Sequence, residues 1–160
     1  MKRWICALCA FILLATCGCS QSTSKPVKPV NFYYKTDPDN YQANAITPET
    51  RESKGYEDDL KGLIQLYING PISKTYLNPF PKKTVVDSIT VNTTTVDLQL
   101  NAQFAQLSDL DMTTACACLT MTILEITQRH RLIINAVDES GNIIYTISMT
   151  KDYLLLCDYG

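Results

Sequence analysis

The sequence is poor in the side chains from which catalytic and metal centres are built. It has one histidine, His130, among 160 residues, so a site that needs several histidines is excluded. Nucleophile-elbow, phosphate-loop and dinucleotide-binding glycine patterns are absent, and so are internal repeats. We therefore expect no catalytic residue, no metal ion, no non-covalent cofactor and no enzymatic activity.

Positive charge is also scarce. The 14 Lys and Arg residues are outnumbered by 16 Asp and Glu residues, and the basic residues form no block. Nucleic acids and anionic lipid headgroups attract proteins mainly through clustered cations. The composition therefore argues against nucleic acid as a partner, and it leaves membrane attachment to some other device.

Cysteine is concentrated near the N-terminus, where it cannot form a disulfide framework. Four of the seven cysteines lie within the first 19 residues, which leaves Cys116, Cys118 and Cys157. With three cysteines, one bridge from Cys157 to Cys116 or to Cys118 is the most that the domain could form. The simpler interpretation is that all three are small, buried apolar side chains.

The first twenty residues, by contrast, have the build of an export signal. Lys2 and Arg3 precede an apolar run, residues 5–14, that is too short to span the roughly 30 Å core of a bilayer as a helix. Residues 17–20, Cys-Gly-Cys-Ser, then resemble the lipobox of bacterial lipoproteins, in which a cysteine is acylated and becomes the mature N-terminus.

Two cysteines compete for that lipid. We expect Cys19 to carry it, because Gly18 provides the small residue that suits cleavage. Cys17 is the alternative, since Leu14 and Ala15 stand at the preferred positions before it. The expected group is a covalent diacylglycerol with palmitate, which would hold the protein at the extracytoplasmic face of the cell membrane.

The chain divides into three parts on this interpretation. Residues 1–18 are the signal peptide, and residues 19–30 are the lipid anchor and a flexible spacer with two prolines. Residues 31–160 form one domain, because removal of residues 1–18 from the 160-residue chain leaves 142, enough for one core.

Two helices are predicted within the domain. Residues 56–69 repeat apolar side chains at helical spacing, begin with acidic residues and end at Gly70-Pro71. A second helix begins near Ser108, where Asp111 three residues later resembles a capping box. Its apolar stripe continues to Ile126 in spite of many threonines, and the cations of residues 128–131 close it.

Strands are predicted where apolar and polar residues alternate or β-branched residues cluster, at residues 31–35, 85–91, 95–100, 132–137 and 143–149, with 153–157 as a further edge strand. The proline-containing segments 41–55 and 72–83 are expected to be loops. The order β-α-β-β-α-β predicts an α+β fold: a small sheet of about four to six strands with two helices on one face.

The most distinctive surface that the sequence predicts is a sheet edge. An exposed last strand can pair with another copy or another chain. We expect Ile143, Tyr145 and Ile147 on the last hairpin, and Tyr76 and Phe80 in the long loop, to form an interaction surface. The alternative for each aromatic ring is packing in the core.

From residue 46 to residue 137 the chain resembles the GerMN, or germane, domain of Gram-positive lipoproteins. The features that carry the resemblance are short segments spread along the chain: Ile46–Arg51, Leu66–Pro71, Thr84–Val91, Thr95–Leu98, Leu119–Ile126 and Leu132–Asp138. Two features depart from the family pattern. Lys82-Lys83 stands where the family often has a Pro-Gly turn, and one copy of the domain is present.

The resemblance implies a compact domain related to ring-building modules, which occurs in sporulation and germination proteins and assembles rather than catalyses. We therefore expect a membrane-anchored protein that binds a protein partner or itself. A solute- or glycan-binding lipoprotein is the alternative, and it predicts a pocket lined by Tyr76 or Phe80. A small hydrolase is the least favoured, and it would depend on His130 or Cys118.

Overall fold

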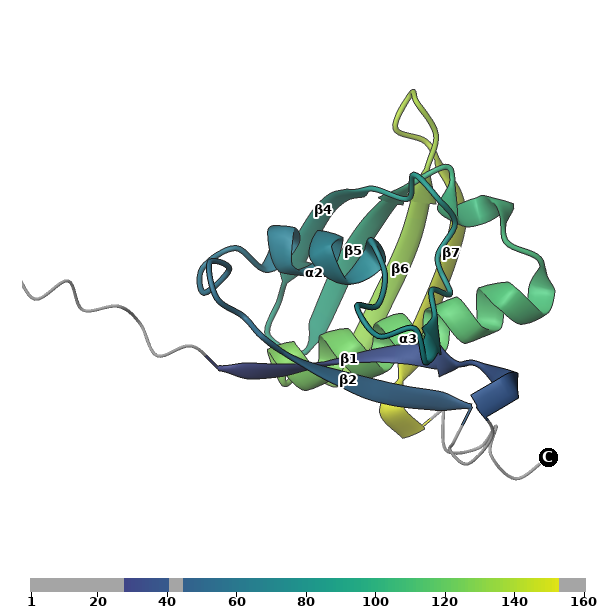
Figure 1. Ribbon diagram of the computed structural model, residues 1–160. Coiled ribbons are helices and arrows are strands. Elements are labelled where there is room, and N and C mark those ends of the chain that lie inside the picture. Colours follow the sequence, from purple (N-terminus) through teal and green to yellow (C-terminus); the bar gives the residue numbers. More distant parts are fainter. Residues whose placement is uncertain (1–27, 41–44, 153–160) are drawn as a thin grey trace, which may run out of the picture.

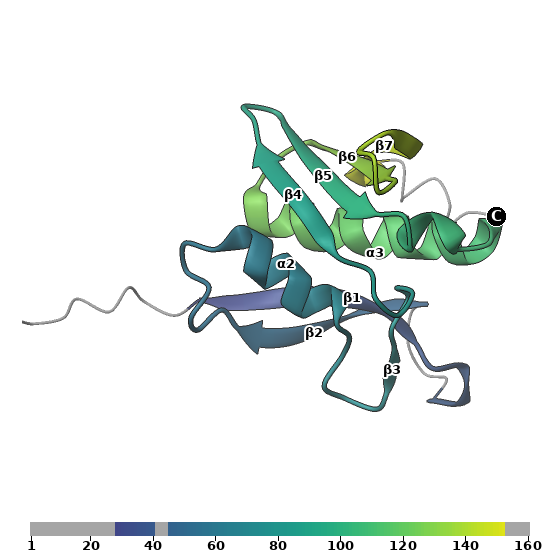
Figure 2. The ribbon, with the colours of Figure 1, turned by 90° about the horizontal axis from the view of Figure 1, so that it is seen from above.

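The computed structural model describes residues 28–40 and 45–152, and in them two helices lie between two β-sheets (Figure 1; Figure 2). The smaller sheet has the strand order β2-β1-β3, and the larger has the order β4-β5-β6-β7. The strands are β1 (Pro29–Thr36), β2 (Ile46–Glu52), β3 (Tyr76–Leu77), β4 (Val86–Val91), β5 (Thr95–Asn101), β6 (Arg131–Val137) and β7 (Ile143–Thr150).

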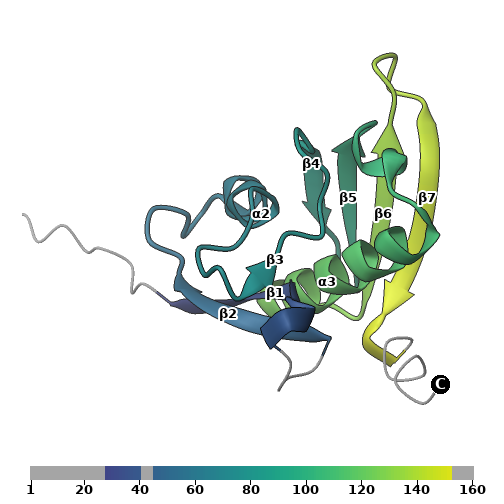
Figure 3. The ribbon, with the colours of Figure 1, turned by 45° about the vertical axis from the view of Figure 1, so that its right-hand side comes forward.

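The helices are α2 (Leu60–Ile68) and α3 (Asp109–Thr127), and two short 3-10 helices occupy Pro38–Asn40 and Phe104–Gln106. Neighbouring strands are antiparallel except β5 and β6, which are parallel. A parallel pair needs a crossover connection, and α3 supplies it. The connection places α3 against the inner face of the larger sheet (Figure 3).

Burial on two sides explains the composition of α3. The helix contacts β1 on one side and β5, β6 and β7 on the other. By length and hydropathy α3 could also cross a membrane, but 56% of that apolar window is buried inside the domain. A helix that is apolar nearly all round is the expected product of such double coverage.

The α+β class is confirmed, and so is the position of β4 to β7 within two residues of the predicted strands. The strands form two sheets instead of the single predicted one, since β1 pairs with β2 and β3 and with no strand of the larger sheet. The predicted loop at residues 72–83 contains β3, and the segment predicted as a loop at residues 41–55 contains β2. Both loop predictions were wrong at these strands. Pro48 is tolerated because β2 is an edge strand, where a missing N–H group need not break a ladder. Residues 153–157, predicted as a strand, lie outside the described residues.

Both helix starts differ in detail from their predictions. The first helix begins at Leu60, after Asp59, whose carboxylate accepts the N–H of Gly62 at 2.8 Å. Ser108 does precede α3, but its hydroxyl donates to the Asp111 carboxylate at 3.2 Å and caps no backbone N–H. The predicted capping box is therefore wrong.

The end of α3 also differs, because it falls at Thr127 and the cations follow it. Gln128 takes a left-handed conformation with φ of 55°, and its N–H donates to the Leu124 carbonyl. Gln128 thus caps the helix, residues 129–130 connect it to β6, and Arg131 is the first residue of that strand, so the predicted cations do not lie in the last turn of α3.

Candidate functional site

An ion pair and a group of aromatic rings fix the interior of the smaller sheet. Arg51 pairs with Glu49 two residues away on β2, and its guanidinium lies 5.1 Å from the centre of the Phe32 ring and 5.6 Å from that of Tyr34. Arg51 also donates to the carbonyl of Gly70 at 2.8 Å. These contacts join β2 to the end of α2.

Glu49 extends the same junction to the loop after α2. Its carboxylate accepts the N–H groups of Ile72 and Ser73, the latter at 2.8 Å. Burial alone would raise the pKa of this carboxyl, but the hydrogen bonds from Ser73, Arg51 and Ile72 outweigh it and hold the pKa below its ordinary value. Glu49 is therefore a charged structural group in this loop junction.

Tyr76 and Phe80, the loop aromatic residues predicted for the interaction surface, belong to this interior. The Phe80 ring is 5% exposed and meets the Tyr67 ring edge-on, with 5.1 Å between centroids. Tyr76 is half-buried and stacks on Tyr34 at 6.4 Å. The prediction is corrected for Phe80, because a ring that fills the core cannot also meet a partner.

Alternation along β7 also corrects the expected surface. Tyr145 and Ile147 are half-buried against the core, and the Tyr145 ring packs on Phe104 with 6.4 Å between centroids. Ile143 is 57% exposed, as predicted. The side chains that point away from the core are those of Ile144 and the following even-numbered residues, Thr146 and Ser148.

The reactive side chains of α3 are placed as structural groups. Cys116 and Cys118 are fully buried, and burial raises the pKa of the first thiol to about 11 and of the second to about 12. His130 lies exposed after the helix. Among the described residues, no three His, Cys, Asp or Glu side chains are grouped to hold a metal ion. Cys157 lies outside the described residues.

A side chain from α2 covers the outer edge of β4. Gln65 accepts the N–H of Val86 at 2.8 Å and donates to the carbonyl of Thr84 at 3.2 Å. Lys61, one turn earlier, donates to the carbonyl of Asp87 at 2.9 Å. Within β4 these bonds occupy the N–H of Val86 and the carbonyl of Asp87, so side chains of α2 obstruct the start of this edge against strand addition.

The smaller sheet is closed by different means. On β1 the N–H of Tyr33 donates to the Thr122 hydroxyl of α3 at 3.0 Å, and its carbonyl accepts the Tyr67 hydroxyl of α2 at 2.6 Å. Pro48 lies opposite Tyr33 and interrupts the N–H groups along β2. Both long strands of this sheet are thus unsuited to accept another strand.

The outer edge of β7 has none of these protections in the part of the chain that the structure describes. Its eight residues include no charged residue, no proline and no glycine, and one irregularity interrupts the pairing near Val137. No hydrogen bond joins its free edge to another described element. A long uncharged edge strand is the kind that natural proteins usually blunt.

The open edge continues into the outer face of the larger sheet. The helices lie on the opposite side of this sheet, so no described helix covers the outer face (Figure 2). Polar side chains pair across the strands there: Ser88 with Gln99 at 3.0 Å, and Thr146 with Asn135 at 2.7 Å. The edge of β7 together with the part of this face that β6 and β7 form is the candidate docking surface.

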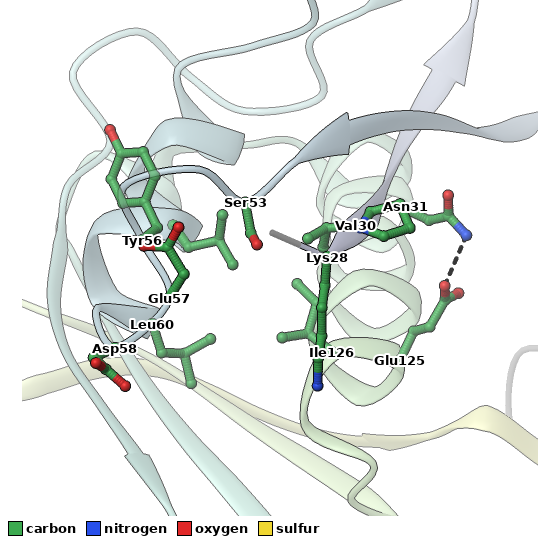
Figure 4. A pocket seen from close by; sticks show the side chains of 12 residues that line it. Lys28, Val30, Asn31, Ser53, Tyr56, Glu57, Asp58, Leu60, Glu125 and Ile126 are labelled. Carbon is green, nitrogen blue, oxygen red and sulfur yellow. Dashed lines mark hydrogen bonds between the residues drawn. The ribbon is translucent and has the colours of Figure 1, made fainter. Parts of the chain in front are cut away.

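A separate pocket of about 430 Å³ lies where β1 begins, between the start of α2 and the end of α3 (Figure 4). Apolar side chains of Leu60, Leu63 and Ile126 share its lining with Lys28 and with the carboxylate of Glu125. Two donors already occupy that carboxylate, the Asn31 amide at 2.8 Å and the Tyr33 hydroxyl at 2.7 Å. Tyr76 and Phe80 do not line this pocket.

Sequence reasoning missed the residues that close the sheet edges. Gln65 and Thr122 read as ordinary helix residues, and Pro48 reads as a loop signal. One signal was available: threonine recurs in α3 at a cost in helix propensity, which indicates that some hydroxyls have partners outside the helix. Which threonine meets β1 depends on how the helix is rotated, and the sequence does not contain that angle.

Comparison with known proteins identifies the domain. A family model named Germane, described as sporulation and spore germination, matches residues 31–139. No curated protein sequence matches the chain.

Two solved structures are similar in fold. The tandem GerMN domains of the sporulation protein GerM from Bacillus subtilis match 81% of this chain at 17% identity, with a TM-score of 0.54. The chain covers 49% of that structure, about half its length. A candidate lipoprotein from Clostridium perfringens matches 79% of this chain and 89% of its own at 19% identity, with a TM-score of 0.48.

Proposed function

The chain belongs to the Germane family of sporulation and spore germination domains, and we propose that it is a lipid-anchored assembly domain at the extracytoplasmic face of the cell membrane. The domain binds a protein partner through the outer edge of β7 and the adjoining face of the larger sheet. Sporulation or germination is the setting that family membership favours.

One observation carries the proposal, the unequal protection of the sheet edges. Gln65 and Lys61 bond the first two residues of the β4 edge, and α2 and α3 bond the free backbone groups of Tyr33. The edge of β7 is eight residues long and uncharged. Because soluble proteins usually blunt such an edge, its retention beside two blunted edges supports a docking role.

The anchoring half of the proposal rests on the N-terminal sequence. The basic start, the short apolar run and the Cys-Gly-Cys-Ser segment favour export and acylation, with Cys19 as the lipid carrier and Cys17 as the alternative. Multiple acyl chains hold a protein firmly at a bilayer without help from basic residues. A covalent lipid thus suits a chain with formal net charge −2.

A ligand-binding lipoprotein is the second candidate, and the pocket beside Lys28 is the observation in its favour. Its mixed lining, in which Leu60, Leu63 and Ile126 lie beside Lys28 and Glu125, would suit a small amphiphilic solute. Isothermal titration with the full chain would report such binding. Solute binding that survives Thr146→Lys on β7 would favour this candidate over assembly.

Photo-crosslinking in native membranes tests the docking surface directly. A photoreactive residue replaces Ser148 on β7, and a matched one replaces Thr90, which is also exposed but lies on β4. We expect a discrete protein adduct from position 148 that is absent from position 90 and lost on Thr146→Lys. Equal adducts from both positions, or none from position 148, would contradict a docking role for β7.

Palmitate labelling tests the anchor. Cys19→Ser is expected to abolish incorporation of labelled palmitate, and Cys17→Ser is expected to leave it unchanged. The reverse result would assign the lipid to Cys17. Loss of label in neither variant would refute lipidation at this segment.

A further inference from the structure

We infer that the partner of β7 is a second copy of this chain, and that two copies pair β7 antiparallel to form one continuous eight-stranded sheet. The inference rests on the proposed docking role of β7. It adds the identity of the partner and the symmetry of the contact.

The first support is that β7 is compatible with itself. In an antiparallel pair, residues directly opposite each other point to the same face of the sheet. Two copies related by a two-fold axis would therefore place Thr146 and Ser148 among the hydroxyl side chains of the partner. The inner row, Tyr145 and Ile147, would continue the apolar layer that each copy already has.

The second support is the absence of charge. Like charges facing each other across a strand pair destabilise it, and any charged residue on β7 would face its own kind in a symmetric contact. Residues 143–150 contain none. The exposed Ile143 and Ile144, 57% and 51% accessible, would gain the partner strand as cover.

The third support is the position at which β1 begins. A two-fold axis that relates two antiparallel strands of one sheet stands perpendicular to that sheet, so it keeps matching layers on the same side. In each copy the smaller sheet lies across the helices from the larger sheet (Figure 2), and β1 begins there at Pro29. Both β1 strands therefore begin on the same side of the joined sheet.

Two chains anchored in the same membrane need their first strands to begin on the same side of the joined sheet. Two copies anchored in one leaflet can pair without turning either domain over. Confinement to a surface also raises the effective concentration of each copy for the other, so a weak strand contact becomes significant.

Disulfide crosslinking between copies tests the geometry. Full-length chains with two different tags are expressed together in bacterial membranes, with Cys157→Ser to remove the C-terminal thiol. We expect oxidation to link the two tagged chains through Thr146→Cys, near the two-fold axis. The matched control, Thr90→Cys on β4, is expected to give at least about fivefold less linked product, since it lies on the opposite edge of the sheet, whose first two residues are bonded by α2.

Charge exchange at the same position tests self-recognition. Thr146→Lys in both copies, or Thr146→Glu in both, is expected to lower association of the tagged chains about fivefold, as measured by co-purification after mild detergent extraction. A mixture of one Lys copy and one Glu copy is expected to restore it. Restoration also shows that both variants are folded.

Two results would overturn the inference, and they differ in whether they also contradict the proposed docking role of β7. If the photoreactive residue at position 148 yields adducts only with other proteins and the charge mixture restores nothing, self-pairing is wrong while the proposed docking role stands. If position 148 yields no protein adduct at all, both self-pairing and the docking role of β7 are overturned.

Discussion

The three-stranded sheet and the four-stranded sheet cover opposite sides of the same two helices, but different contacts hold them. In the larger sheet, each strand pairs along most of its length and aliphatic side chains such as Leu98 and Ile134 fill the inner face. In the smaller sheet, β3 has two residues, and β1 depends on side chains of α2 and α3 for its free backbone groups.

The difference explains which sheet can offer an edge. A sheet held by its own ladder keeps its geometry when its last strand is left open. In a sheet held by side chains from other elements, the backbone groups of the free edge are already hydrogen-bonded to those side chains. We expect the following changes to test this contrast, in order of decreasing effect.

Loss of Arg51 is expected to have the largest effect, because the smaller sheet depends on it. Arg51→Ala leaves Glu49 in its partly buried position without a counter-charge and should lower the free energy of unfolding by about 3 kcal/mol. Urea denaturation followed by circular dichroism measures the change. Arg131→Ala, an exposed arginine on β6, is the matched control and should cost no more than about 0.5 kcal/mol. Equal losses of stability in Arg51→Ala and Arg131→Ala would contradict the contrast between the two sheets.

Removal of the Thr122 hydroxyl tests the bond between α3 and β1. Thr122→Val leaves the N–H of Tyr33 without an acceptor, and we expect a loss of about 1–2 kcal/mol with faster amide exchange at Tyr33. Thr120 is equally buried, but its hydroxyl donates to the Cys116 carbonyl of its own helix. Thr120→Val should therefore be nearly neutral, and a similar loss in both variants would contradict the assigned role.

Opening the protected edge tests what closes it. Gln65→Leu removes the acceptor for the Val86 N–H, so we expect a loss of about 1 kcal/mol in stability. Crosslinks from position 90 on β4 should then rise toward those from position 146 on β7. Gln106→Leu, at an exposed position away from the sheet edges, is the control and should leave the crosslinks at position 90 unchanged.

The smallest expected effect is a pH dependence centred on Glu49. Its pKa is lower in the folded protein than in the unfolded chain, so its stabilising contribution is present above the unfolded value, about pH 4.3, and is lost as pH falls through the folded value. This one group cannot change the free energy of unfolding by more than about 1.4 kcal/mol per pH unit. Denaturation at several pH values below 5 should show a shallower slope in Glu49→Gln, and an unchanged slope would assign the acid sensitivity elsewhere.

The same contrast decides how much the sequence predicted. The alternation of β4 to β7 follows from one face being buried, and it was read to within two residues. The interval that contains β2 shows proline and polar residues and was predicted as a loop. It becomes a strand because β1 pairs with it residue by residue. Thr47 bonds Thr36, and Glu49 pairs with Arg51, and no local sequence pattern predicts these contacts.

The exposure of the residues proposed for an interaction surface was predicted in part for the same reason. Ile143 is exposed on β7 as the pattern indicated, and the strand itself is present. Phe80 was assigned to the surface because it lies in a long loop, but loop residues can fold back onto a core. Tyr67 of α2 supplies the surface that receives the Phe80 ring.

The sequence by itself determined the elements whose residue pattern reflects their own burial, namely two helices and the four strands of the larger sheet. It also determined the family to which the domain belongs. Tertiary structure alone decided which edges are open. An edge is closed when a side chain such as Gln65, Lys61 or Thr122 comes within hydrogen-bond distance of it. That distance depends on how helices are placed and rotated on a sheet, and these are properties of the packed molecule rather than of any segment.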